Sequence, residues 1–92
     1  MNTFGQILRK LIRIHTPYTI HGWAIDIGFP KTIVYHWAND LYYPPMDRLI
    51  IMAEYFADVS GKPFTELLAM FCVVHPLAQQ ITQRRRAIAA HP

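Results

Sequence analysis

Apolar residues near the start of the chain follow the spacing of three and four positions that places side chains on one face of a helix. The residues in this pattern are Phe4, Ile7, Leu8, Leu11 and Ile12. Thr3 and Gln6 have the form of a capping box, which favours a helix start at this point. Pro17 disfavours helix just before it, so we predict a helix over residues 4–15.

The next segment predicts two short helices separated by a glycine. Thr19 is suited to cap the first of them, and Gly28 to end it in the left-handed conformation. Pro30 suits the first turn of the other helix, which Asn39 and Asp40 should end because both tolerate left-handed backbone. We expect this helix to turn three residues inward: Ile33, Val34 and Trp37.

The second half of the chain predicts two more helices after a loop. Pro44 and Pro45 prevent the loop over residues 41–45 from continuing a helix. Helical spacing then recurs at Met46, Leu49, Met52, Ala53 and Phe56. Residues 60–63, Ser-Gly-Lys-Pro, should separate this helix from a fifth that begins near Phe64. Five short helices predict an all-α compact bundle with short connections.

The composition is that of one domain with a tail. The chain has 92 residues, 52% of them hydrophobic, which is enough for a single core. We assign residues 1–74 to the domain and residues 75–92 to a C-terminal tail. Leu77, Ile81 and Ile88 have helical spacing in that tail, and Arg84–Arg86 is a basic run. The tail is therefore either a dimerisation helix or a disordered segment.

Charge and hydropathy point to a cytoplasmic protein that could meet nucleic acid. The formal charge is +3 and the sequence pI is about 9.3, which is compatible with a polyanionic partner. No apolar run approaches the ~20 residues that a membrane-spanning helix needs, and the first residues lack the order of a signal peptide.

The residues that could carry catalysis or bind a metal form no recognisable pattern. Cys72 is the single cysteine and lies in an apolar run. The five histidines have no pair at i, i+4, and the six acidic residues are scattered. We therefore expect no metal, no cofactor and no enzymatic activity.

Four residues between the second and third predicted helices have roles that a tight helical turn requires. Ala24 is small, Gly28 suits the turn, and Val34 and Trp37 can pin the following helix to the core. This spacing resembles the helix-turn-helix of the Cro and lambda-repressor-like family, and the resemblance extends over about residues 4–68. It implies that Trp23 takes a core position and that Asp40 stands where the family usually has glycine.

The resemblance implies that the third helix reads DNA in the major groove. Val34 and Trp37 then leave four neighbouring residues to face outward: Lys31, Thr32, Tyr35 and His36. Further donors for DNA phosphates are expected on the first helix and in the loop: Arg9, Lys10, Arg13, Asn39, Tyr42 and Tyr43. Of these we assign Arg13, Asn39 and Tyr42 to the site.

The resulting functional hypothesis is a sequence-specific transcriptional regulator. It would act as a repressor that binds double-stranded DNA at a palindromic operator. It would bind as a homodimer whose two reading helices lie about ten base pairs apart. The dimer surface would include residues 71–74 and the tail stripe. The alternative is a protein-interaction module of the same fold, an antitoxin or anti-repressor. It would bind a protein partner through Ile20 and Ile25, which we expect to be exposed, and through Tyr42–Tyr43.

Overall fold

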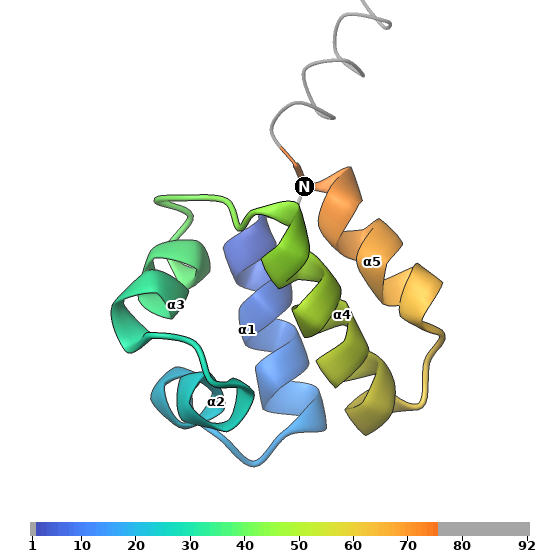
Figure 1. The fold of residues 1–92 in the computed structure, drawn as a ribbon, viewed down its shortest axis with the longest axis horizontal. Helices are drawn as coiled ribbons and strands as arrows, with labels where there is room; N and C mark the ends of the chain where they lie inside the picture. The colour runs from blue at the N-terminus through green and yellow to red at the C-terminus, as the bar shows by residue number, and fades with distance from the viewer. Residues whose placement is uncertain (1, 76–92) are drawn as a thin grey trace, which may run out of the picture.

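The computed structural model describes residues 2–75, and all regular structure in this part of the chain is helical (Figure 1). The helices are α1 (Phe4–His15), α2 (Ile20–Ile27), α3 (Lys31–Ala38), α4 (Met46–Ser60) and α5 (Phe64–Val73). The predicted all-α bundle of five short helices is confirmed. The tail stripe of Leu77, Ile81 and Ile88 and the run Arg84–Arg86 lie outside the described residues.

The predicted start of α1 is confirmed in its atomic detail. The Gln6 amide donates to Thr3 Oγ1 at 3.2 Å, and the Thr3 amide donates to Gln6 Oε1 at 3.0 Å. Both bonds satisfy N–H groups that have no partner within the helix. The helix ends at His15, as the sequence predicts.

The turn between α2 and α3 also follows the prediction closely. Thr19 Oγ1 accepts from the Gly22 amide at 3.2 Å, and Gly28 ends α2 with φ 88°. Pro30 precedes α3 instead of lying within it. α3 ends at Ala38, before Asn39 and Asp40, as predicted; Asp40 has φ 59° and Asn39 has φ −99°, so the aspartate takes the left-handed conformation that both residues tolerate.

The core contains most of the predicted apolar residues, including Trp23, Val34, Trp37 and Phe56. One inward assignment is wrong, because Ile33 is 36% exposed; Met46, which belongs to the apolar spacing of α4, is 54% exposed. An eight-residue helix buries only a narrow stripe, and Ile33 lies about 100° from Val34 around the helix axis. Met46 is the first residue of α4, ahead of the turn that packs against the core.

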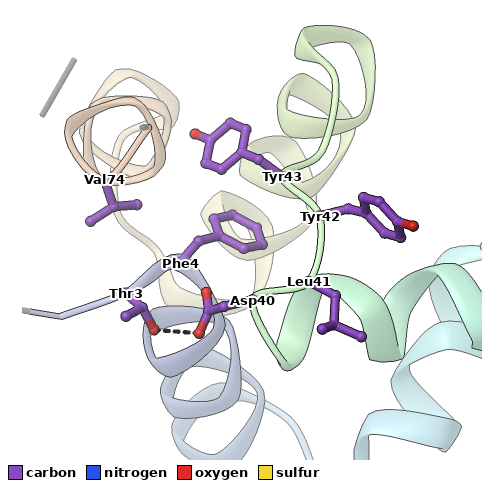
Figure 2. Close-up of a pocket in the computed structure, with 7 residues that line it drawn as sticks. All are labelled: Thr3, Phe4, Asp40, Leu41, Tyr42, Tyr43 and Val74. Atoms are coloured by element: carbon purple, nitrogen blue, oxygen red, sulfur yellow. Dashed lines mark hydrogen bonds between the residues drawn. The ribbon is translucent and has the colours of Figure 1, made fainter. Parts of the chain in front are cut away.

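Asp40 and Gly5 join the start of α1 to the end of α3. The Gly5 amide donates to Asp40 Oδ1 at 2.8 Å, and Thr3 Oγ1 donates to Asp40 Oδ2 at 2.7 Å (Figure 2). A Cβ on Gly5 would lie 2.3 Å from the Ala38 carbonyl oxygen, so only glycine permits this approach. The contact sets the position of α3 relative to α1.

α4 packs against both α1 and α5, and Figure 1 shows α3 and α5 at opposite ends of the bundle. Phe71 of α5 is fully buried against Phe4 and Phe56. It was expected in a dimer surface, and that assignment is wrong because the apolar side of α5 faces the core. Within residues 2–75, none of the helices combines the length and apolar character that crossing a membrane requires.

Candidate nucleic-acid interface

α3 has a buried side and an exposed side, and the residues expected to read DNA lie on the exposed one. Val34 and Trp37 are buried, as predicted, and hold the helix against the core. Lys31, Thr32 and Tyr35 are exposed. Positions 31, 32 and 35 lie within one turn of each other, so these three side chains form a continuous polar strip.

His36 lies at the edge of this strip, where it contacts the loop after α3. Its ring is half-buried and meets the Tyr42 ring edge to face, with centroids 5.2 Å apart. Tyr42 itself is 66% exposed and, as Figure 2 shows, points away from Phe4 and Tyr43. The structure therefore brings two of the predicted site residues into direct contact.

The turn before α3 is supported by a cation that sequence reasoning missed. The Phe29 ring packs edge to face on Trp37, with centroids 5.5 Å apart. The Arg48 guanidinium of α4 lies 4.7 Å from the Phe29 ring centroid, a cation–π arrangement. Arg48 thereby places a positive charge beside the turn that leads into Lys31. The two partners are far apart in the sequence, so no spacing signal indicates the contact.

Arg9 of α1 binds the end of α3. Its Nε donates to the Ala38 carbonyl oxygen at 3.1 Å, and its Nη2 donates to Asn39 Oδ1. A cation is favourable at this end because the last carbonyl groups of a helix carry partial negative charge. Asn39, a predicted phosphate contact, is thus held in place by α1.

Arg13 lines a different cleft, between the end of α1 and the start of α2. This cleft has a volume of about 380 Å³ and is also lined by Arg9, Thr16, Tyr18 and Thr19. The backbone N–H groups at a helix start favour anions, and the Arg13 guanidinium adds to that preference. Arg13 therefore does not join the strip on α3 but lies where a separate anion contact is possible.

The hydroxyl groups of two other tyrosines, Tyr43 and Tyr55, form hydrogen bonds with residues of the protein itself. The Tyr43 hydroxyl donates to the Phe71 carbonyl oxygen, and burial, with a smaller effect of Cys72, raises the Tyr43 pKa to about 12. The Tyr55 hydroxyl donates to Asp26 Oδ2 at 2.8 Å. Burial and this bond raise the Tyr55 pKa to about 12. Tyr43, expected as a phosphate donor, instead joins the α3–α4 loop to α5.

The exposed apolar side of α2 is smaller than the sequence suggests. Ile25 is 66% exposed, as expected. Ile20 is half-buried and packs against the core, so the expectation that it projects into solvent is wrong. α1 and α2 are in contact, and Ile20 lines the cleft between them together with Ile12 of α1.

No protein-family model, curated protein or solved structure matches this chain. The interpretation of the site therefore rests on its own geometry.

Proposed function

We propose that this protein is a sequence-specific DNA-binding transcriptional regulator, a repressor, acting in the cytoplasm. The observation that carries the proposal is the exposed strip of Lys31, Thr32 and Tyr35 on a helix that Val34 and Trp37 anchor. A helix held by its opposite face after a tight turn is the geometry with which such helices enter a major groove.

The chemistry of the strip suits base edges. The Lys31 ammonium can donate to guanine O6 and N7 or to a phosphate, and Thr32 offers a hydroxyl and a methyl group. Tyr35 adds a hydroxyl and an apolar ring edge. His36, held by Tyr42, would contact the groove wall at the border of this surface. None of these side chains offers the two-donor fork of arginine, so the shape of the DNA should contribute to specificity.

Phosphate contacts would flank the strip on two sides. Arg13 and the start of α2 supply donors in the cleft between α1 and α2. Asn39 and the exposed hydroxyl of Tyr42 supply donors after α3. These contacts carry no sequence information but would fix the orientation of α3 on the duplex.

We further propose that the protein binds DNA as a homodimer. A single eight-residue reading helix can contact only a few bases, which is too few for tight specific binding. Two copies would place their α3 helices about 34–36 Å apart, in successive major grooves of a palindromic operator. Selection of bound duplexes from a random library tests this idea, because a two-fold symmetric motif with that spacing supports it.

The decisive test compares Lys31→Ala with Lys62→Ala at several salt concentrations. Both changes remove one exposed lysine, but Lys62 belongs to the connection between α4 and α5. Figure 1 shows that this connection is on the far side of the bundle from α3. We expect Lys31→Ala to weaken DNA binding roughly tenfold and to lower the salt slope by about 1. Lys62→Ala should change neither quantity. Equal effects of the two substitutions would exclude α3 as the reading helix.

A second candidate function is a protein-interaction module, an antitoxin or anti-repressor. Ile25 and Leu41, which are 66% and 63% exposed, favour it because exposed apolar side chains can mark a protein interface. Its binding would change little with salt, whereas phosphate contacts weaken steeply. A folded protein that selects no DNA motif, and whose partner binding is lost in Ile25→Asp, would favour this second candidate.

A further inference from the structure

A pocket lies where the start of α1, the loop between α3 and α4 and the end of α5 meet (Figure 2). Thr3 and Phe4 line it on the α1 side, Val74 lines it after α5, and the loop contributes residues 40–43. The pocket has a volume of about 250 Å³. Ligand pockets usually measure ~300–1,000 Å³, so a pocket of this size suits a small molecule.

Most of the pocket wall is apolar. The Phe4 and Tyr43 rings, which both line it, pack edge to face with centroids 5.3 Å apart. On the loop side, the side chains of Leu41 and Tyr42 are largely exposed. A molecule with an apolar body would remove part of this surface from water, which favours binding.

The Asp40 carboxylate gives the pocket a negative charge. It accepts hydrogen bonds from two neutral donors, the Gly5 amide at 2.8 Å and the Thr3 hydroxyl at 2.7 Å. A carboxylate has about four acceptor positions, so Asp40 can accept from further donors. No lysine or arginine of residues 2–75 forms an ion pair with Asp40. A ligand cation could therefore pair with this charge.

The helix ends beside the pocket also favour a cation. Val74 directly follows α5, and the last carbonyl groups of a helix carry partial negative charge. The start of α1 carries partial positive charge, but Asp40 itself accepts from the Gly5 amide there. Arg9, which binds the end of α3, does not line the pocket.

These features select one class of small molecule. An ammonium group can donate to the Asp40 carboxylate in charge-assisted hydrogen bonds, and aromatic rings such as that of Tyr43 attract cations. An anion would be repelled by Asp40, and a neutral molecule would forgo the charge interaction. The apolar wall adds the requirement of an apolar body on the ligand.

We propose that this pocket binds a small organic ammonium ion, whose N–H groups donate to Asp40 and whose apolar body packs against Leu41 and Tyr43. Tyr42 also belongs to the proposed DNA contacts, but Lys31, Thr32 and Tyr35 do not line the pocket. The inference does not depend on DNA binding, and its tests use the protein without DNA.

Three probes with the same aromatic body and different charges test the proposal: phenethylammonium, phenethyl alcohol and hydrocinnamate. Each is titrated into the full-length protein, and the backbone amide shifts are followed by NMR. We expect the ammonium ion to bind at least about tenfold more tightly than the alcohol, because charge-assisted hydrogen bonds are about twice as strong as neutral ones. Hydrocinnamate should bind most weakly, and the largest shifts should lie at Gly5, Asp40 and Leu41. Equal affinities of the ammonium ion and the alcohol, or shifts centred outside the pocket, would overturn the proposal.

The role of the carboxylate is tested by Asp40→Asn with Asp58→Asn as the matched control. In Asp40→Asn the amide oxygen can still accept from the Gly5 amide, and the amide nitrogen can donate to Thr3 Oγ1. Asp58 is an exposed residue near the end of α4 and does not line the pocket. We expect Asp40→Asn to weaken phenethylammonium binding at least about tenfold and to leave the alcohol unaffected, whereas Asp58→Asn changes neither. Equal effects of the two substitutions would contradict the proposal; the comparison of the three probes on the wild-type chain decides it should Asp40→Asn not fold.

The apolar wall is tested by Leu41→Ala with Ile25→Ala as the control. Both residues are largely exposed, but Ile25 lies on α2 and does not line the pocket. Leu41→Ala should weaken the binding of phenethylammonium and of phenethyl alcohol by the same factor, about two- to tenfold, because both lose the same apolar contact. Unchanged affinities in Leu41→Ala would show that the aromatic body of the probe does not lie in this pocket, which would refute the proposal.

Discussion

The contact between Gly5 and α3 allows the effect of one substitution on the free energy of unfolding to be predicted with its magnitude. In Gly5→Ala the new methyl carbon would lie 2.3 Å from the Ala38 carbonyl oxygen and 2.8 Å from both the Ala38 carbonyl carbon and Asp40 Oδ2. Carbon–oxygen contacts in proteins are rarely closer than about 3.3 Å, so α1 and α3 must separate by about 1 Å. Two of the three atoms are backbone, so a side-chain rotation cannot relieve the clash.

The separation would cost more than the new methyl group contributes. Overpacking of this kind costs about 1–3 kcal/mol. The Gly5 amide would also lose part of its bond to the Asp40 carboxylate, and bonds to charged groups contribute about 1.5–3 kcal/mol when intact. Alanine is more favourable than glycine within a helix, which offsets up to about 1 kcal/mol of this loss of stability. We therefore expect the free energy of unfolding to fall by about 2–4 kcal/mol.

Gly22→Ala is the matched control for this experiment. Gly22 is also in a helix, but a Cβ there would meet its nearest atoms, in Tyr18, at 3.4 Å. That substitution should leave stability unchanged or raise it by up to about 1 kcal/mol. Urea unfolding followed by far-UV circular dichroism measures both variants. If Gly5→Ala is as stable as Gly22→Ala, the close approach of α1 and α3 is not a feature of the folded protein.

Three further predictions test other parts of the fold. Tyr55→Phe should lower the free energy of unfolding by about 0.5–1.5 kcal/mol at pH 8. Because the Tyr55 pKa is raised to about 12, the interactions that favour its neutral hydroxyl contribute fully to stability below pH ~10. This contribution is lost as the pH rises toward 12, so the free energy of unfolding should fall more over that range in the wild-type protein than in Tyr55→Phe. Asp40→Gly relieves the left-handed backbone yet should destabilise by about 1–2 kcal/mol, because both bonds to α1 are lost; a thermal melt showing a gain would refute this. Leu67→Ala, at a fully buried position, should cost about 2–5 kcal/mol in urea unfolding, whereas Leu41→Ala, at an exposed position, should cost under about 0.5 kcal/mol.

Part of the candidate site follows directly from the sequence. Once Val34 and Trp37 are taken as buried, the helical repeat alone turns Lys31, Thr32 and Tyr35 outward, and all three are exposed. The apolar pattern alone does not indicate which apolar residues stay exposed. Ile33 is apolar, but the bundle contacts only a narrow stripe of the eight-residue α3, and that stripe excludes it. Met46 is exposed because it is the first residue of α4 and precedes the turn that packs against the core.

The surroundings of the site depend on contacts between residues far apart in the chain. Arg9 binds the end of α3, Arg48 lies over Phe29, and Tyr43 binds the backbone of α5. Each of these side chains is ambiguous in the sequence, because a surface cation or tyrosine fits a solvated face or a phosphate contact equally well. Their roles became evident only when the helices were placed relative to one another.

The sequence by itself determined where the helices begin and end. Capping boxes, prolines and left-handed glycines act through atoms within about four residues. Thr3 and Thr19 therefore mark helix starts, and Gly28 and Gly61 mark helix ends, without reference to the rest of the fold. Only the tertiary structure decided which polar side chains are engaged within the protein and where a pocket is left between α1, the α3–α4 loop and α5. The reason is that both depend on how closely the helices approach, and that distance is set jointly by the whole core, including the glycine at which α1 meets α3.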